Sequence, residues 1–423
     1  MLSEQRELMI NLERASENTN KVKTFAIALF AFSILCSVTL AEASMLLLAG
    51  VLVLGYYREN DPLSLFARIK GQPLFRPWMF YLAAGLLSAL FALDTGKALR
   101  YLPSDLIKYA CFAVLFAGLK KDGLAVMSRF YAAGAAFVAA AGIAEALWGF
   151  HINGNFDLRA GAFSNPVRFG EIMVIAATFV FSRLLASGDT ETRAIWKTHV
   201  PALVLIFSAI VLSQSRGPYL GFAVMVGLMF WFGIPSRKKV ARWSLAFLLI
   251  GGFISLLNPA FRDRLTGTPG VQPAGAVNYG DSSVGINIRL ELWRLGFRMF
   301  SDRPILGVGP ANVKSAFKRY HPAPIAYQET WGSIHNLYLH HMAERGLIGL
   351  AALLTLFGAM LALAMRNFRA ERNAYTLWAL TILPPYFIMN LTEISFQHIH
   401  TSFAVFMALA ASTNSVSPDR SSL

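Results

Sequence analysis

Four residues carry the strongest chemical signal in this sequence: Arg159, Arg216, Arg289 and His335. The arginine side chain presents a planar fork that matches phosphate oxygens. Histidine is partly neutral near physiological pH and can accept a proton. Together these side chains suit displacement of a diphosphate leaving group, in which the arginines neutralise the diphosphate and the histidine activates an attacking hydroxyl.

Two of these arginines also have plainer interpretations. Arg216 could be a charged anchor at the end of a membrane helix, and Arg289 could reach water or pair with a nearby carboxylate. The pattern of Ile286–Phe300 predicts an amphipathic helix that stops at Asp302-Arg303-Pro304. Arg289 falls on the apolar side of this helix, in line with Trp293. A buried arginine needs a partner, and a bound phosphate would be one.

Composition indicates a membrane protein. The chain has 423 residues, of which 55% are hydrophobic and 15% charged, whereas a soluble protein carries about 25% charged residues. A helix needs about 20 apolar residues to cross the hydrocarbon core. We predict an all-α, polytopic integral membrane protein with about twelve transmembrane helices, at residues 24–41, 44–57, 77–94, 105–119, 128–149, 168–187, 197–213, 219–234, 241–257, 337–365, 374–391 and 397–412.

Basic residues in the short turns set the orientation. Lysine and arginine gather after the second, fourth, eighth and tenth predicted helices, and such turns face the cytoplasm. Both termini are then cytoplasmic, and the long loop is outside, which in a bacterium is the periplasmic side of the inner membrane. The formal charge of +14 would suggest nucleic acid in a soluble protein. Here it follows largely from the orientation, so no nucleic-acid partner is predicted, and the positive charge left outside favours a bound anion.

The predicted organisation has four parts. Residues 1–258 hold transmembrane helices 1–9, and residues 259–335 form a periplasmic catalytic loop with short amphipathic helices. Residues 336–412 hold helices 10–12, and residues 413–423 form a cytoplasmic tail. Within the loop, the glycine- and proline-rich stretch Gly267–Gly275 predicts turns and coil.

The start of the tenth helix is unusual. One helix from His335 to Met365 would extend about 45 Å, and its uninterrupted apolar part begins only at Leu347. We therefore expect residues 335–345 to stand above the hydrocarbon or to line a cavity, with His335 at or near the helix start. The glycine-rich turn Gly307–Asn312 upstream could direct its amides at an anion.

Three further histidines, His321, His340 and His341, are close to His335 in the sequence. No cysteine or well-spaced carboxylate completes a metal site with them, so neither a metal nor a cofactor is predicted. His340 and His341 are expected at the surface or in packing.

Four segments occur in a characteristic order: Arg159–Pro166, Ser213–Gly217, Asp302–Asn312 and His335–Gly349. In these segments the chain resembles the O-antigen ligase/polymerase family. The placement of the large loop between the ninth and tenth helices is also similar to that family. The resemblance covers most of the chain and is strongest from about Arg159 to Leu350.

Members of this family move a glycan from undecaprenyl diphosphate to an acceptor in the periplasm, and the ligases attach O-antigen to a sugar of lipid A–core. The resemblance implies a glycosyltransferase that works by metal-independent, inverting transfer. It implies that His335 deprotonates the acceptor hydroxyl and that Arg216 and Arg289 hold the donor diphosphate. Arg159 would be a supporting contact. Three more residues are expected to support the site: Asn336, Asn312 and Trp293.

Several functions share this donor chemistry. The length, the helix count and the amphipathic loop helix favour the ligase over the O-antigen polymerases and protein O-oligosaccharyltransferases of the same family. The predicted partners are an undecaprenyl-diphosphate-linked glycan, lipid A–core and membrane lipids. A transporter of lipid-linked glycans would also need basic residues in a cavity, but we find no repeat between the two halves of the sequence, which many transporters have.

Overall fold

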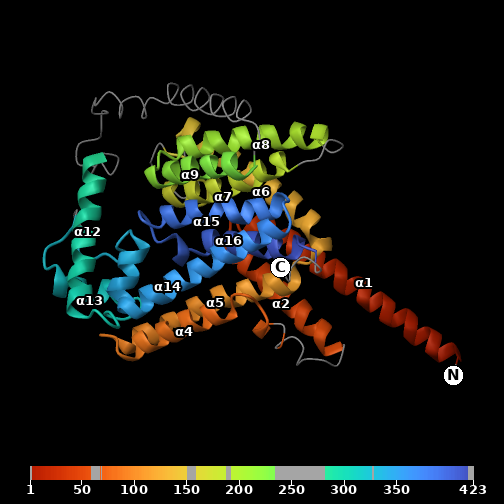
Figure 1. The fold of residues 1–423 in the computed structure, drawn as a ribbon, viewed down its shortest axis with the longest axis horizontal. Helices are drawn as coiled ribbons and strands as arrows, with labels where there is room; N and C mark the ends of the chain where they lie inside the picture. Colours follow the sequence, from red (N-terminus) through yellow and green to blue (C-terminus); the bar gives the residue numbers. More distant parts are fainter. Residues whose placement is uncertain are drawn as a thin grey trace.

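The computed structural model describes residues 2–58, 67, 69–149, 159–186, 192–233, 282–325 and 328–417. Its regular structure is helical (Figure 1), so the all-α class is confirmed. The helices are α1 (Leu2–Ser33), α2 (Val38–Arg58), α4 (Phe75–Leu90), α5 (Thr95–Gly118), α6 (Leu124–Trp148), α7 (Pro166–Leu185), α8 (Thr192–Leu212), α9 (Arg216–Gly233), α12 (Ser282–Asp302), α13 (Val313–Tyr320), α14 (Leu337–Ala370), α15 (Ala374–Met389) and α16 (Ile399–Ser415), with short 3-10 helices η1 (Lys121–Gly123) and η2 (Ser395–Gln397).

Several of these helices have the character of membrane spans. Shorter apolar helices cover Trp196–Leu212 and Ala374–Met389. Among the described residues, three segments are long and apolar enough to cross a membrane: Val38–Tyr56, Lys121–Trp148 and Leu337–Ala370. This is the pattern of a multi-pass membrane protein. The helix predicted at 241–257, the stretch Gly267–Gly275 and residues 418–423 of the tail lie outside the described residues.

Two predicted helix boundaries are wrong. The first predicted span, 24–41, is divided where α1 ends and α2 begins, although no glycine or proline marks the division. The fourth, 105–119, lies in a helix that begins earlier, at Thr95. Asp94 caps that helix by accepting a hydrogen bond from the Lys97 amide at 2.9 Å, which stabilises a first turn too polar to register as a span.

The middle of the bundle is buried on all sides. In Figure 1, α15 and α16 lie between the group α7, α8 and α9 and the group α4, α5 and α14. Helices that are apolar all round are expected in such a position, and most residues of α7, α15 and α16 are buried. Outer helices instead expose large apolar side chains, such as Phe80 and Leu86 of α4, which suits contact with lipid.

The loop helices α12 and α13 lie together at one end of the bundle, beside the start of α14 (Figure 1). The predicted amphipathic helix Ile286–Phe300 is confirmed within α12, which ends at Asp302 as expected. A second, small hydrophobic core joins these elements, and it includes Leu292, Leu295, Met299, Val308, Phe317 and Ile334.

α14 is broken near its start. Gly346 has φ +61° and ψ −161°, so Leu337–Arg345 and the remainder of α14 are separate helical segments. We refer to Leu337–Arg345 as the half-helix. The break falls directly before Leu347, where the uninterrupted apolar run of the sequence begins. Backbone groups freed by a break need new partners in apolar surroundings, and the Leu347 amide finds the carbonyl of Pro304 at 2.8 Å.

The turn between α12 and α13 supplies further partners. The amides of Val308 and Gly309 donate to the carbonyls of Ala343 and Glu344, each at 2.8 Å. These two amides are therefore used within the protein, and the expectation that they face a bound anion is wrong. The turn instead ties α12 to the half-helix.

Gly346→Ala is expected to lower stability. A left-handed backbone at a non-glycine residue costs about 1–3 kcal/mol, and a Cβ at this position would lie 2.2 Å from the Ile305 carbonyl oxygen. Gly358, further along α14, has no heavy atom within 4 Å of such a Cβ, so Gly358→Ala is the matched control. Thermal unfolding should show a lower midpoint for Gly346→Ala alone. Equal midpoints for the two variants would contradict the role of the break.

Candidate functional site

A pocket of about 310 Å³ gathers residues from four distant parts of the chain. Its walls come from the start of α7, from α12, from the segment before α14 and from the turn between α15 and α16. The lining is rich in cations, and one carboxylate is found among the lining residues that the structure describes. They are Arg159, Asn165, Pro166, Val167, Arg168, Ile288, Arg289, Trp331, Ser333, His335, Glu393, Ile394 and His398.

His335 and Glu393 form the central pair of this pocket. The Nδ1 atom of His335 lies 3.0 Å from each carboxylate oxygen of Glu393. The Glu393 side chain is 9% exposed and that of His335 is 28% exposed. The carboxylate is thus nearly enclosed, while the imidazole remains accessible from the pocket.

This pairing determines which nitrogen of His335 carries the proton. Burial alone would raise the pKa of the Glu393 carboxyl group, but the hydrogen bond and charge of His335, with the charge of Arg289, hold that pKa below its ordinary value of 4.5. Glu393 is therefore ionised at neutral pH and can only accept hydrogen bonds. Nδ1 is therefore the donor, and in the neutral imidazole Nε2 then carries the lone pair that a general base needs.

Local backbone and packing hold the imidazole in place. His335 has a left-handed backbone with φ +50°, and its amide donates to Ser333 Oγ at 3.0 Å. Trp331 packs edge-on against the ring, with centroids 5.9 Å apart. Asn336 caps α14 by accepting a hydrogen bond from the Leu339 amide at 3.1 Å. His335 therefore directly precedes the helix cap, as the sequence predicted, and Asn336 acts on the helix start.

Arg289 shares the same carboxylate. Its Nη2 atom lies 3.5 Å from Glu393 Oε1, and its side chain is 34% exposed. An ion pair with a carboxylate was one of the two interpretations of Arg289, but the residue also lines the pocket. A guanidinium has five N–H donors, so one such group can contact a carboxylate and a phosphate together.

Arg159 joins two of the segments that the sequence singled out. Its Nε donates to the Ser213 carbonyl at 3.0 Å and its Nη2 to Ser215 Oγ at 2.7 Å. The amide of Ala160 donates to the Leu212 carbonyl at 2.9 Å. Arg159 therefore lines the pocket and braces the turn that leads into α9.

Arg216 is not among the described residues that line this pocket. It is the first residue of α9 and is exposed. It directly follows the turn that Arg159 braces. The structure therefore brings three of the four predicted residues, Arg159, Arg289 and His335, into one pocket, and places Arg216 at the end of the turn that Arg159 braces.

Asn312 and Trp293 also lie away from the pocket lining. Asn312 is fully buried, where its Oδ1 accepts from the Asp94 amide at 3.0 Å and its Nδ2 donates to the Asp94 carbonyl at 3.2 Å. Trp293 packs against the second hydrophobic core. These contacts tie the loop to the start of α5 and to itself. The supporting roles of Asn312 and Trp293 stay predictions.

Glu393, Arg168 and His398 also line the pocket, although none of them was predicted as a site residue. Arg168 lies in the first turn of α7 and is exposed. His398 precedes α16, and its buried Nδ1 has no hydrogen-bond partner within the described part of the chain. Glu393 left one signal that could have been followed, because it is an acidic residue in a short turn between two apolar runs.

His340 and His341 were expected at the surface or in packing. They are 2% and 0% exposed, so both are packed in the interior and neither lies at the surface. Both belong to a buried polar network. Within the described ranges, no group of three or more histidine, cysteine or acidic side chains is arranged to hold a metal ion.

A histidine oriented by a carboxylate and flanked by arginines is the arrangement that a general base beside an anion-binding site requires. Here that site is set in a helical membrane protein. Residues 201–354 match the family described as O-Antigen ligase. The chain carries an O-antigen ligase family domain, and this stretch includes Arg216, Arg289 and His335. The family resemblance drawn from the sequence is confirmed.

A distant relative was also found. A stretch of 159 residues, 36% of this chain, is 24% identical to an uncharacterized protein of Haemophilus influenzae. The match covers 39% of that protein, so it spans less than half the length of the relative.

Glu393→Gln should lower stability in a manner that depends on pH. The folded-state pKa of Glu393 lies below its ordinary value of 4.5, so its pairing stabilises the fold above pH 4.5 and is lost as the pH falls through the folded-state pKa. The difference in thermal midpoint between the wild type and Glu393→Gln should therefore be present at neutral pH and shrink in acid. A difference that persists unchanged in acid would speak against an ionised Glu393.

Proposed function

We propose that this protein is an O-antigen ligase that transfers a glycan from undecaprenyl diphosphate to a sugar hydroxyl of lipid A–core. The observation that carries the proposal is the Nδ1 atom of His335, bound by Glu393 in a pocket that three arginines also line. The O-antigen ligase family domain supports a lipid-linked glycan as the donor.

In the proposed reaction, Nε2 of His335 takes the proton of the acceptor hydroxyl as its oxygen attacks the anomeric carbon of the donor sugar. The new carbon–oxygen bond forms while the bond to the diphosphate oxygen breaks, so the configuration at that carbon inverts. The proton ends on Nε2, and the carboxylate of Glu393 stabilises the imidazolium. The electron pair leaves with undecaprenyl diphosphate.

The leaving diphosphate needs positive charge around it. Arg289 and Arg159 are the proposed ligands in the pocket, because a guanidinium can hold two phosphate oxygens at once. Arg216 is proposed to reach the diphosphate from the start of α9, and Arg168 adds a further positive charge to the lining. This neutralisation takes the place of a metal ion, and the proposal includes no cofactor.

We place the protein in the bacterial inner membrane, with about twelve spans, both termini cytoplasmic and the pocket facing the periplasm. The support is that the pocket gathers residues from four segments that the charge of the turns assigns to one side of the membrane. The lipid tail of the donor gives a reason for a site at the end of a membrane bundle. Polymerases and protein O-oligosaccharyltransferases of the family would use the same donor with another acceptor.

His335→Ala should abolish transfer but leave donor binding intact, because it removes the base and keeps the arginines. The measurement is a lipopolysaccharide gel from ligase-deficient cells that supply a compatible donor and core. His321→Ala is the matched control, since His321 belongs to the same loop and is absent from the described pocket lining. We expect ladders from the wild type and His321→Ala, and none from equally expressed His335→Ala.

Each other result has a defined meaning. Ladders from all three proteins would show that His335 is not the catalytic base. No ladder from the wild type would reject ligation to lipid A–core, and polymerase and protein acceptors would then be tested with the same donor.

Arg289→Lys should be nearly as damaging as Arg289→Ala, because a point charge cannot replace the planar fork. We expect release of undecaprenyl diphosphate by purified protein to fall about 100-fold in both variants. Arg294→Lys is the matched control, since Arg294 lies on the exposed face of the same helix and pairs with Glu291. Full activity of Arg289→Lys would indicate that Arg289 serves only as an ion-pair partner of Glu393. A transporter would release no undecaprenyl diphosphate at all.

A further inference from the structure

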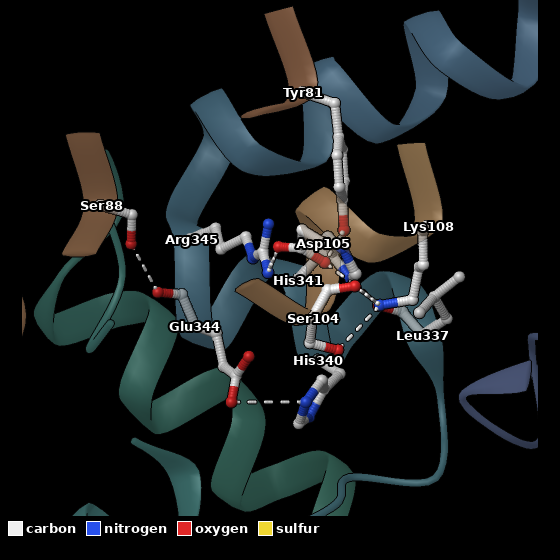
Figure 2. A network of polar contacts seen from close by, with 10 residues as sticks. All are labelled: Tyr81, Ser88, Ser104, Asp105, Lys108, Leu337, His340, His341, Glu344 and Arg345. Atoms are coloured by element: carbon white, nitrogen blue, oxygen red, sulfur yellow. Dashed lines mark hydrogen bonds and ion pairs between the residues drawn. The ribbon is translucent and has the colours of Figure 1, made fainter. Parts of the chain in front are cut away.

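A buried polar network joins the half-helix to α4 and α5 (Figure 2). It lies apart from the pocket, since none of its members is among the described lining residues. Each member is at most 2% exposed. The members are Tyr81, Asp105, Lys108, His340, His341, Glu344 and Arg345.

Asp105 of α5 is the centre of this network. Its Oδ2 accepts a hydrogen bond from Arg345 Nη2 at 2.6 Å, and its Oδ1 accepts from Lys108 Nζ at 3.2 Å. Arg345 is the last residue of the half-helix, directly before the break. A short, charge-assisted bond between buried groups holds them closely, because separation would leave charges without partners.

Tyr81 of α4 contacts the same segment. Its hydroxyl lies 3.1 Å from His341 Nε2, and its ring centroid lies 5.1 Å from the Arg345 guanidinium carbon. The Nδ1 atom of His341 in turn lies 3.1 Å from the Leu337 carbonyl. Figure 2 shows these side chains converging between the half-helix and α4 and α5.

The half-helix depends on such contacts because it is short. Helices of fewer than about 12–15 residues are marginal on their own, and the break at Gly346 separates this one from the rest of α14. Its first amide, at Leu337, donates to the carbonyls of Asn390 and Glu393 at 2.8 and 3.0 Å. The position of the half-helix therefore decides how His335, two residues earlier, meets Glu393.

We propose that Asp105 is a positioning residue: through Arg345 it holds the half-helix, and through the half-helix it aligns His335 with Glu393 and the pocket. The catalytic part of this inference rests on the proposed glycan transfer. A displacement of about 1 Å in a reacting group can cost about 100-fold in rate. A small movement of the half-helix is therefore enough to be measured.

The test compares Asp105→Asn/Lys108→Met with Lys108→Met, as purified full-length protein in lipid nanodiscs. The double variant removes one charge of each sign and weakens the bond to Arg345. The single variant keeps that bond and is the matched control. We expect kcat per folded molecule to fall about 10–100-fold in the double variant. The KM for the donor should change little, because the pocket arginines are untouched.

Amide hydrogen exchange reports movement of the half-helix independently of catalytic activity. The half-helix should exchange faster in the double variant than in Lys108→Met, while α15 should exchange as before. Tyr81→Phe keeps the ring and removes only the hydroxyl, so it should change both readouts in the same direction and by less. This milder variant provides the test if the double variant does not fold.

Two results would overturn the positioning role. One is a double variant whose kcat and half-helix exchange match those of Lys108→Met. If the double variant does not fold, the equivalent result is a Tyr81→Phe variant that matches the wild type in both measurements. The other is faster exchange throughout the protein with unchanged kcat per folded molecule, which is what a purely structural ion pair predicts. A wild type that transfers no glycan would refute the proposed function instead. The local exchange comparison would still decide whether Asp105 holds the half-helix.

Discussion

A break in a membrane helix is stable only where other parts of the protein satisfy the freed backbone groups. At Gly346 this constraint is met by the turn after α12, whose amides and carbonyls bond to both sides of the break. The same bonds dock α12 against α14. As a result Arg289, on α12, and His335, before α14, reach one carboxylate, Glu393. The hydrogen bonds that satisfy the backbone at the break therefore also help to place Arg289 and His335 in one pocket.

The half-helix is held by two kinds of interaction. Backbone hydrogen bonds secure its end at the break, and buried side-chain charges secure its flank against α4 and α5. Ser88 of α4 connects the two, because its hydroxyl lies 2.7 Å from the Leu306 carbonyl and 3.0 Å from the Glu344 carbonyl and can share its one proton between them. Turn, half-helix and α4 thus form one polar junction inside an otherwise apolar bundle.

Much of this fold could be predicted from local patterns. Apolar runs identified most of the helices, and the amphipathic pattern identified α12. The break at Gly346 was not predicted, although the uninterrupted apolar run begins directly after it, at Leu347. Three of the four leading site residues meet in one pocket. The capped start of α5 was missed because hydropathy does not register a polar first turn.

What remained hidden depends on contacts between residues distant in the sequence. Glu393 pairs with a histidine 58 residues away, and a lone acidic residue in a turn has no periodic signal. His340 and His341 could not be placed in the interior, because a polar residue is buried only where a partner exists. For His341 that partner is Tyr81, 260 residues earlier.

The order of these contacts along the chain has a consequence for biosynthesis. Arg159, Arg289 and His335 all leave the ribosome before Glu393. A nascent chain therefore holds the histidine without the carboxylate that determines its tautomer, and the pocket is complete only once the turn between α15 and α16 has been made and placed in the membrane. The pocket is therefore completed late in synthesis, after α15 has been made.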